Sequence, residues 1–490
     1  MSLIIPANTL ASGGYAVDNS LRFNGGSSDS LNRTLGTPTN NKKYTISTWV
    51  KKTKNSGNVN GNSQSLMGTI GGDDTYFEFN GSTDQLFFGE YSSSAWQIEI
   101  KTNRVFRDNS AWYHIVVAVD TTQGTEGNRV KLYVNGVQET SLAQTNYPSE
   151  DFNTKLNSAS NHYISNNGNI GGDYAAYLEG YLSEYFFIDG LQLAPTDFGE
   201  FDEDSGIWKP IDVSGLTFGD NGFYLDFENS GALGADVSGE SNNFTVNNLT
   251  AIDQSTDTCT NNFATWNPLV HYSTSATFSE GNLKVAPTEN TSTVYTVSTI
   301  GMPTVSGSKW YAEFKYLETN DVAIIGILDA AQISYVFRNN SDLDNQNGDT
   351  SVGRVTYRSG NGLIKFPSGQ SVDSSVTLTN NDIVMIALDS GSGKIWFGVN
   401  GTWFNSGNPA TGSNGVDFTG QSWWTAGVDD FVFFVGDGNT GGHDDWEANF
   451  GSPSYAISSG NTDGNGYGNF EYAVPSGYFS LNTKNLAEYG

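Results

Sequence analysis

The segments VKLYVNGVQE and KIWFGVNGTWFNSG share an Asn-Gly pair between two strand-like runs, and this repeat is the strongest constraint on the fold. Asn-Gly is the preferred pair for the two-residue type I′ turn of a β-hairpin, which needs positive φ at both positions. The turn predicts that Val134 faces Val137 in the first copy and that Gly398 faces Trp403 in the second. We expect the Trp403 ring to cover the bare backbone of Gly398. One such hairpin in each half of the chain indicates two domains of similar construction.

The composition favours two all-β domains. The chain has 490 residues, which is enough for two sandwiches of about 200 to 250 residues each. It contains 57 glycines but only 12 prolines, which together with many Asn, Ser and Thr residues is typical of short strands joined by turns. Apolar residues alternate with a period of two in YTISTWVK, YHIVVAVD, DIVMIALD and FVFFVGDG, and no stretch keeps the 3.6-residue period of a helix.

The charge and the amino terminus argue against several function classes. The formal net charge is −30, which would repel phosphate backbones, so we expect no binding of nucleic acid. The single cysteine, Cys259, excludes an internal disulfide. The segment MSLIIPANTL lacks the basic region and the apolar length of a signal peptide, and no segment has the roughly 20 apolar residues of a membrane span. We therefore expect neither export by a standard signal peptide nor membrane insertion.

Two stretches resemble known domain families. The segments WYHIVVAVD, RVKLYVNGVQ and GYLSEYFFIDGLQL are similar to a laminin-G-like jelly-roll of the concanavalin A-like lectin and glucanase superfamily, over residues 21–193. The segments KWYAEFKY, DIVMIALDSGSGKIWFGVNGTWFNSG and FVFFVGDG resemble a SPRY domain, over residues 310–450. Members of both families are two-sheet sandwiches of related topology. The resemblance therefore implies that the two hairpins are the same structural element.

This resemblance implies an all-β fold of two concanavalin A-like antiparallel β-sandwiches joined by a structured connector. The laminin-G-like domain is predicted to span residues 1–193, with an N-terminal arm at about 1–14, and the SPRY-like domain is predicted to span 270–490. Residues 194–269 between them are acidic or rich in Asn and Thr, yet they carry many aromatic residues. That much apolar surface favours a structured connector over a disordered linker.

The ends of the chain and the connector also resemble virion-associated proteins of tailed phages, of the marine type, in MSLIIPAN, GGYAVDNSLRFN, NNFATWNPL and PSGYFSLNTKNLAE. The resemblance implies a virion surface protein, made in the host cytoplasm, that acts as a tail fibre or a head-decorating adhesin. Its partners would be other virion proteins of the tail or capsid and a host-surface polysaccharide, and we expect a homo-oligomer. Two alternatives stay open, a purely structural decoration protein and a glycan depolymerase.

No catalytic residue is predicted. The segment EFDED places Glu200, Asp202 and Asp204 at alternate positions, as glucanases of the jelly-roll superfamily place their nucleophile and acid. It follows LAPTDFG and precedes GIWKP without apolar alternation around it, so we interpret it as a solvated turn. His114 begins an apolar strand and is interpreted as a framework residue. We therefore predict that the protein is not an enzyme.

Calcium is the one cofactor that the sequence suggests. Laminin-G-like and lectin jelly-rolls often bind this ion through Asp, Asn and backbone oxygens of loops, because a hard cation prefers oxygen ligands. The glycine-rich segments IGGDD and IGGD offer Asp73, Asp74 and Asp173 as metal ligands. The alternative is that both segments are glycine turns with solvent-facing aspartates.

Two loops of the second half carry rings beside acidic residues, a combination that binds sugars by stacking and by hydrogen bonds to hydroxyl groups. The loop GQSWWTAGVDD contains Trp423 and Trp424, and the loop GDGNTGGHDDWEANFG contains Trp446 beside Asp444 and Asp445. We predict that these five residues bind glycan. The alternative is that the rings belong to the core or to an interface, and one of the two adjacent tryptophans in particular can be a core residue.

Overall fold

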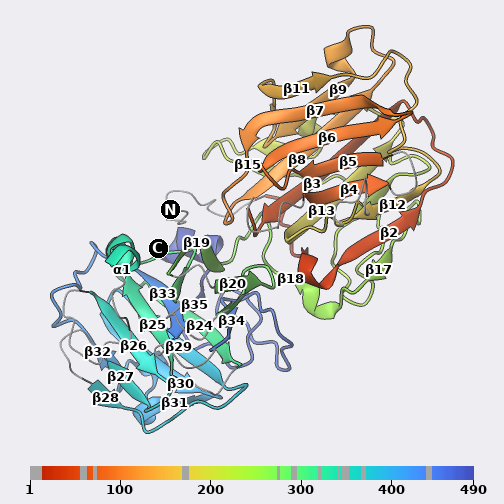
Figure 1. The fold of residues 1–490 in the computed structure, drawn as a ribbon. Coiled ribbons are helices and arrows are strands. Elements are labelled where there is room, and N and C mark those ends of the chain that lie inside the picture. Colours follow the sequence, from red (N-terminus) through yellow and green to blue (C-terminus); the bar gives the residue numbers. More distant parts are fainter. Residues whose placement is uncertain are drawn as a thin grey trace. The chain divides into compact units, whose positions relative to one another are not determined.

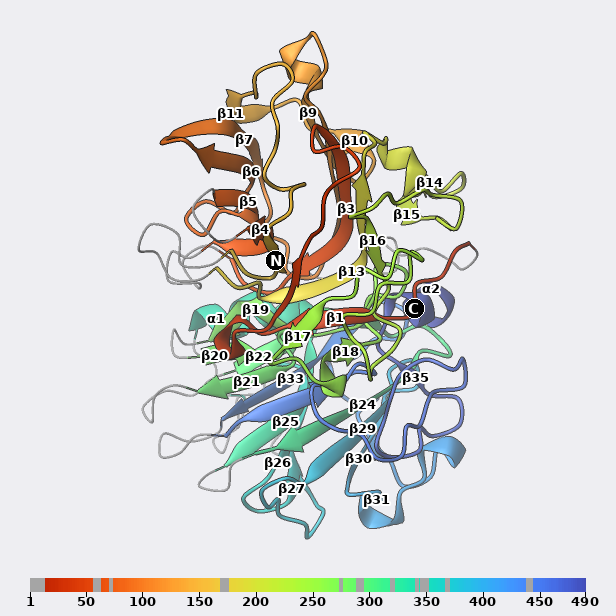
Figure 2. The same cartoon turned by 90° about the vertical axis from the view of Figure 1, so that its right-hand side faces the viewer.

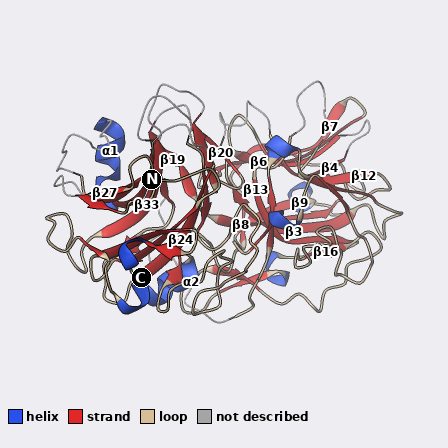
Figure 3. Cartoon of the chain, turned by 90° about the horizontal axis from the view of Figure 1, so that it is seen from below, coloured by secondary structure: helices blue, strands red, loops and turns tan. Residues whose placement is uncertain are grey.

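The computed structural model of the chain consists of strands and loops with a few short helices (Figure 3). Its described residues divide into two compact units, 14–260 and 261–490. No helix in the described part of the chain is long and apolar enough to cross a membrane. The structure describes residues 14–55, 63–69, 74–167, 176–272, 276–287, 295–317, 322–339, 343, 352–365, 371–437 and 444–490.

The first unit contains two antiparallel sheets (Figure 1). In the order of hydrogen-bonded neighbours, its first sheet consists of β10 (Val137–Gln138), β9 (Val130–Val134), β8 (Trp112–Asp120), β3 (Lys43–Lys52), β13 (Gly180–Asp189), β1 (Ser20–Phe23) and β18 (Gln254–Ser255), with β16 (Phe223–Leu225) also on β13. Its second sheet consists of β11 (Leu142–Asn146), β7 (Ala95–Val105), β6 (Gln85–Ser92), β5 (Asp74–Phe79), β4 (Gln64–Thr69), β12 (Asn161–Ile164), β2 (Ser30–Thr34) and β17 (Thr245–Asn247). A separate hairpin contains β14 (Gly199–Phe201) and β15 (Trp208–Pro210). Figure 2 shows the two sheets as separate layers, with β4 to β7 in one and β3, β9 and β13 in the other.

The second unit also contains two sheets. One consists of β19 (Trp266–Tyr272), β22 (Tyr295–Ser298), β33 (Asp430–Asp437), β25 (Ala323–Asp329), β26 (Arg354–Arg358), β27 (Leu363–Lys365) and β28 (Ser371–Asp373), with β23 (Met302–Pro303) on β33. The other consists of β20 (Ala276–Ser279), β21 (Lys284–Pro287), β34 (Trp446–Asn449), β24 (Lys309–Tyr316), β29 (Ile383–Asp389), β30 (Lys394–Val399) and β31 (Thr402–Trp403), with β32 (Val416–Asp417) on β30 and β35 (Phe479–Ser480) parallel to β24.

In the described part of the whole chain, the α-helices are α1 (Ile333–Asn339) and α2 (Thr483–Tyr489). Short 3₁₀ helices are η2 (Gly25–Ser27), η3 (Glu126–Asn128), η4 (Pro195–Asp197), η5 (Ala251–Asp253), η6 (Ala330–Gln332), η7 (Phe404–Ser406) and η8 (Pro409–Thr411).

The two units have the same strand order. The series β9-β8-β3-β13-β1 of the first unit corresponds to β30-β29-β24-β34-β21 of the second, and β7-β6-β5-β4-β12-β2 corresponds to β28-β27-β26-β25-β33-β22. Corresponding strands also follow one another along the chain in the same sequence. The predicted fold class, two antiparallel sandwiches in an all-β chain, is confirmed. The two Asn-Gly hairpins, β9–β10 and β30–β31, occupy the same place at one end of the strand order.

Both hairpins have the predicted register. Val134 pairs with Val137, and Gly398 pairs with Trp403. The four turn residues have positive φ, as a type I′ turn requires: Asn135 (48°), Gly136 (78°), Asn400 (50°) and Gly401 (83°). The local sequence was therefore sufficient to predict the pairing of these strands.

The nearest side chain over Gly398 is that of Met385, and the predicted cover by the Trp403 ring stays a prediction. A Cβ atom built at Gly398 would lie 2.7 Å from the methyl carbon of Met385, which pairs with Gly398 from the neighbouring strand β29. The Trp403 ring lies edge-on to Tyr311, with 6.4 Å between the ring centroids. The side chain over the glycine thus comes from a strand that the hairpin sequence does not contain.

Alternation along the strands produces an apolar core between the two sheets of each unit. In the first unit, Ile46 on β3 and Phe77 on β5 are fully buried in one cluster. In the second unit, Phe314 on β24 and Phe433 on β33 are fully buried in another cluster, with 5.6 Å between the ring centroids. Burial of each such side chain contributes about 1.5–3 kcal/mol to stability.

Residues 194–260 are integral to the first unit. Strand β16 pairs with β13, β17 pairs with β2, and β18 pairs with β1. Charged side chains hold the end of this segment, since Lys51 Nζ lies 2.7 Å from Asp257 Oδ2 and both side chains are almost completely buried. The division between the two units falls after Thr260. The sequence-based boundaries at 193 and 269 stay predictions, and a fragment that ends at residue 193 tests the first of them against the division after Thr260.

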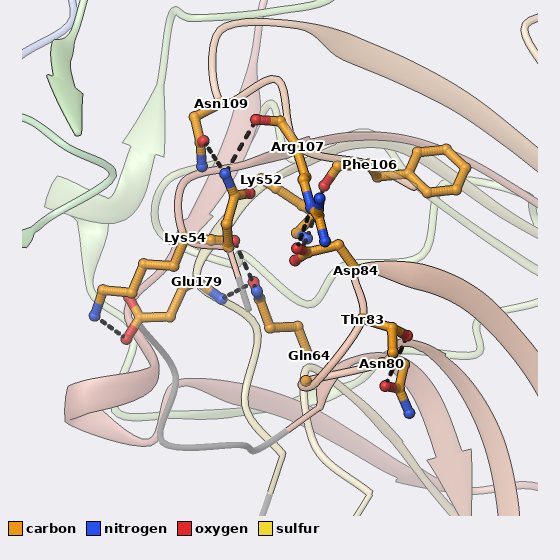
Figure 4. A network of polar contacts seen from close by, with 12 residues as sticks. Lys52, Lys54, Gln64, Asn80, Thr83, Asp84, Phe106, Arg107, Asn109 and Glu179 are labelled. Atoms are coloured by element: carbon orange, nitrogen blue, oxygen red, sulfur yellow. Dashed lines mark hydrogen bonds and ion pairs between the residues drawn. The ribbon is translucent and has the colours of Figure 1, made fainter. Parts of the chain in front are cut away.

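A second buried ion pair joins β3 to the strand connections beside it (Figure 4). Lys52 Nζ lies 2.9 Å from Asp84 Oδ1, and each side chain is 1% exposed. The Nε atom of Arg107 donates to Asp84 Oδ2 at 3.0 Å, and Lys52 also donates to the carbonyl oxygen of Phe106 at 3.0 Å. Burial lowers the pKa of Lys52, while the charge of Asp84 raises it. Because a buried charge needs a partner, these contacts fix the loops at Asp84 and Arg107 against β3.

Candidate functional site

The outer face of the second sheet of the first unit carries a cluster of aromatic side chains. Along β5, Phe77 belongs to the core, so its neighbour Tyr76 points to the opposite face. Phe87 and Tyr91 on β6 and Trp96 on β7 are in ring contact with Tyr76 or with one another. We call Tyr76, Phe87, Tyr91 and Trp96 the aromatic patch. The strands that carry it lie side by side in Figure 1.

Trp96 lies at the centre of the aromatic patch. Its ring centroid is 5.4 Å from that of Tyr76, 5.4 Å from that of Phe87 and 5.3 Å from that of Tyr91. Tyr91 and Trp96 are 37% and 36% exposed, whereas Phe87 is almost buried beneath them. Tyr91 and Trp96 therefore present ring surface to solvent while their neighbours hold them in place.

Two features of the backbone position these rings. A Cβ atom at Gly89 would lie 2.7 Å from Phe87 Cζ and 3.0 Å from Trp96 Cζ3. Because Gly89 has no side chain, both rings can pack directly against the backbone of β6. A register shift between β6 and β7 pairs Tyr91 with Trp96. The Nδ2 atom of Asn146 on β11 donates to the Trp96 carbonyl oxygen at 2.9 Å. The backbone at Trp96 is therefore bound on one side to β6 and on the other side to β11.

Four charged side chains lie at outward positions around the aromatic patch: Asp74, Glu78, Glu99 and Lys101. Pairing across the strands places Asp74 opposite Tyr91 and Lys101 opposite Phe87. The patch is therefore an apolar surface with hydrogen-bonding groups at its border.

Two of these carboxyl groups are held by amides. Gln144 Nε2 donates to Glu99 Oε1 at 2.9 Å, and Asn167 Nδ2 donates to Glu78 Oε2 at 2.8 Å. Burial raises the pKa of Glu78 to about 7, although its hydrogen bonds and the charge of Lys101 lower it. Because Glu78 is only 5% exposed, its carboxyl serves the buried contact to Asn167 rather than the open border of the patch.

The glycan-binding role predicted for Trp423 and Trp446 conflicts with their burial. Trp446 is 1% exposed in the core of the second unit, where its ring centroid lies 5.3 Å from that of Tyr316. Trp423 is 8% exposed and stacks on Phe418, with 5.5 Å between centroids. A buried ring has no free face for a sugar, so the core alternative describes both tryptophans.

The other three predicted residues are Trp424, beside Trp423 in the sequence, and Asp444 and Asp445, which precede Trp446. Trp424 is half-buried, and its Nε1 atom donates to the Ser390 carbonyl oxygen at 3.1 Å. Asp444 is buried and accepts a hydrogen bond from the Tyr316 hydroxyl group. Asp445 Oδ2 lies 3.4 Å from Lys284 Nζ. Of the three tryptophans, only Trp424 keeps appreciable exposed surface, and a sugar site there stays a prediction.

The predicted calcium ligands fall mostly outside the described residues. This applies to Asp73 and Asp173, whereas Asp74 begins β5 and is half-buried at the border of the aromatic patch. Within the described residues, no group of three or more His, Cys, Asp or Glu side chains is arranged to hold a metal ion. A calcium site at the two glycine-rich segments stays a prediction.

The EFDED segment lies on the small hairpin β14–β15 and the turn that joins its strands. Lys209 Nζ lies 3.0 Å from Asp202 Oδ2 and 3.4 Å from Glu200 Oε1. The backbone and hydroxyl of Ser205 donate to Asp202, and these hydrogen bonds lower its pKa. Glu200 and Asp204 are exposed. These carboxylates are therefore ordinary partners of a turn and a lysine.

His114 is a framework residue. It is 1% exposed, and its Nε2 atom lies 2.8 Å from Ser47 Oγ. Trp208 Nε1 donates to His114 Nδ1 at 3.0 Å, so the neutral ring carries its proton on Nε2 and donates to Ser47. Burial lowers the pKa of His114 to about 3. A ring that already donates to Ser47 cannot remove the proton from this hydroxyl, so the pair is not a catalytic dyad.

Sequence reasoning missed the aromatic patch. Its four residues lie on three strands, and their spacing matches no motif. A signal was nevertheless present in DTYFEF and QLFFGEY, where adjacent aromatic residues place rings on both faces of a strand. A half-buried strand normally has rings on one face, so two-sided aromatic strands indicate an outer surface that covers or binds something.

One family model matches part of the chain, that of the Concanavalin A-like lectin/glucanases superfamily, over residues 24–189. The matched residues contain β2 to β13 and the whole aromatic patch. These residues are similar to that superfamily and lie within the first unit. No curated protein matches the chain.

Several solved structures resemble parts of the chain. The SPRY domain of human HERC1 is 14% identical with a TM-score of 0.27, and the match covers 37% of this chain and 96% of that one. A putative carbohydrate binding protein from Bacteroides ovatus is 14% identical with a TM-score of 0.33, covering 48% of this chain and 60% of that one. A SAP-like pentraxin from Limulus polyphemus is 15% identical with a TM-score of 0.26, covering 36% and 78%.

Proposed function

We propose that the protein is a non-enzymatic glycan-binding protein that holds sugar on the aromatic patch of its first unit. The observation that carries this proposal is the contact pair of Tyr91 and Trp96, two large rings that are each more than one-third exposed on a sheet face. Exposed apolar surface bordered by polar groups is typical of an interaction site. The concanavalin A-like domain that carries the patch supports a sugar as the ligand.

The chemistry of the patch suits a sugar. The C–H face of a pyranose ring is apolar and can stack on the exposed rings, while its hydroxyl groups need hydrogen-bond partners at the border. Glu99 and Asp74 accept hydrogen bonds from hydroxyl groups, and Lys101 donates them. Because the rings stand on paired strands and are packed against Phe87, little conformational freedom is lost on binding.

The carboxyl groups on β5 are badly spaced for hydrolysis. Asp74 and Glu78 are four residues apart on one extended strand, so their Cα atoms are separated by about 13 Å. Glycosidases need carboxyl pairs roughly 5 to 9.5 Å apart. One observation leaves the depolymerase alternative open. Burial raises the pKa of Glu78 to about 7, and a general acid that works near neutral pH needs a pKa in that range.

We further propose that the glycan belongs to a host surface and that the protein resides on a tailed-phage virion. This part rests on the resemblance of the chain ends and the connector to virion-associated proteins. Many copies on one particle would strengthen a weak single-site affinity. Mass spectrometry of purified particles tests this location, and absence of the protein from them would contradict it. A protein that is present in particles but binds no glycan would instead support the purely structural role.

A glycan array with matched variants tests the binding site. Trp96→Ala should weaken binding tenfold or more, which corresponds to about 1.4 kcal/mol or more. The control is Phe201→Ala, which removes a ring that is 50% exposed on β14, outside the patch, and should leave binding unchanged. Melting curves of both variants verify the fold. Equal binding by the native protein and folded Trp96→Ala would contradict the proposed site.

A cleavage assay tests the non-enzymatic character. Any glycan that binds is incubated with the native protein, and new reducing ends are measured. We expect no cleavage. Cleavage that is lost in Glu78→Gln would establish a depolymerase at the patch, whereas cleavage lost after amide replacement of Glu200, Asp202 and Asp204 would locate it at the small hairpin.

A further inference from the structure

We infer that the ligand of the aromatic patch is an extended, uncharged polysaccharide that lies across the strands of the second sheet of the first unit. This inference rests on the proposed glycan binding. It is carried by two independent observations, the line of side chains that crosses the strands and the sign of the charges beside it.

The first observation is a continuous cross-strand row. The pairing registers place six outward positions in one line: Tyr163 on β12, Gly68 on β4, Tyr76 on β5, Gly89 on β6, Glu99 on β7 and Asn146 on β11. At Gly68 the row is covered, because Gly68 is buried and Asn167 above it is 6% exposed. The accessible part runs over the four strands from Tyr76 to Asn146, which at about 4.8 Å between neighbouring strands is about 14 Å long and exceeds the length of a single sugar.

The accessible part of the row combines apolar and polar groups. The rings of the patch lie at Tyr76 and over Gly89, and Glu99 and Asn146 follow on the next two strands. An apolar stretch that continues into a carboxyl group and an amide suits a chain of linked sugars, because each sugar has an apolar face and hydroxyl edges. A single small sugar would use only part of this row.

The second observation is the charge at the row. Among the outward positions of β5 to β7, Asp74 and Glu99 carry carboxylates and Lys101 carries an amine, whereas the Glu78 carboxyl is buried, which raises its pKa to about 7. The whole chain has a formal net charge of −30. A sulfated or carboxylated sugar would bring a further anion against these carboxylates and be repelled, whereas hydroxyl groups of an uncharged sugar can donate to them. The charge pattern thus selects against acidic polysaccharides.

The test uses neutral hexasaccharides of β-glucan, mannan and galactan together with the sulfated form of each chain. The native protein should bind at least one neutral chain, and its sulfated form at least tenfold more weakly at low salt. High salt should narrow this difference, because it screens the repulsion. Glu99→Lys should also reduce the difference in affinity between the neutral and the sulfated chain. Glu99→Gln removes the charge but keeps a hydrogen-bonding side chain, so it separates the effect of charge from the loss of a hydrogen bond. The affinity for the neutral chain should rise from the disaccharide to the hexasaccharide.

The outcomes distinguish a failure of the inferred ligand class from a failure of the proposed glycan binding. If sulfated chains bind as tightly as neutral ones, or if disaccharide and hexasaccharide bind equally, glycan binding stands and the inferred ligand class is wrong. If none of the neutral or sulfated chains binds, the proposed function itself fails. Melting curves of the Glu99 variants verify that each is folded, and Asp74→Asn provides a second charge change should either variant unfold.

Discussion

Replacing Asp257 by alanine tests how the first unit is held together. The Asp257 carboxylate lies 2.7 Å from Lys51 Nζ, the two side chains are 1% and 0% exposed, and Trp112 Nε1 donates to the other carboxylate oxygen at 3.1 Å. Asp257→Ala takes this carboxylate from a buried ammonium, which costs about 3–5 kcal/mol. The lost hydrogen bond of Trp112 adds about 1 kcal/mol. We therefore expect the first unit to lose several kcal/mol of unfolding free energy.

Hydrogen exchange measured by mass spectrometry provides the assay, because peptides from β3 and from β24 report separately on the two units. Protection should fall in the first unit and stay unchanged in the second. The matched control is Lys42→Ala, which breaks an ion pair to Asp151 of 2.9 Å whose side chains are 30% and 63% exposed. This exposed pair should contribute only about 0–1 kcal/mol.

A double variant separates the charge effect from a packing effect. Lys51→Met with Asp257→Leu replaces the buried ions by apolar groups, and it should be less destabilised than Asp257→Ala alone. The reasoning is refuted if Asp257→Ala costs no more unfolding free energy than Lys42→Ala. It is also refuted if the two units lose protection together.

Further predictions concern each unit and their boundary. Gly401→Val places a β-branched residue at a φ of 83°, so we expect the second unit alone to lose about 1–3 kcal/mol in chemical denaturation. The folded-state pKa of Glu78, about 7, lies above its ordinary value of 4.5. The unfolding free energy of the first unit should therefore decrease as pH rises from 4.5 to about 7, and Glu78→Gln should reduce this slope in pH-dependent denaturation; an unchanged slope would contradict the raised pKa. A fragment that ends at residue 260 should fold, whereas one that ends at 193 lacks β16, β17 and β18 and should aggregate; dispersed NMR spectra of the shorter fragment would contradict this.

The candidate site shows where sequence reasoning stopped. The sequence predicts a glycan site at Trp423, Trp424 and Trp446 because their rings stand beside acidic residues in glycine-rich loops. The sequence of a loop does not say whether its ring points to solvent or to the core. Trp446 begins β34, whose pairing with β24 carries its ring into the core beside Tyr316. The aromatic patch was missed for the same reason, since its exposure depends on which face of three paired strands the core occupies.

The local sequence alone determined the two hairpins and the alternation that makes each half a sandwich. Asn-Gly selects its turn by the φ values of two adjacent residues, and alternation selects the buried face of a strand, so neither needs a distant partner. Tertiary structure decided the rest. The Met385 methyl group lies over Gly398, Asp257 reaches Lys51 across some two hundred residues, and a register shift brings Trp96 to Tyr91. Each of these contacts depends on which strands become neighbours, and that choice follows from burying both sheets at once.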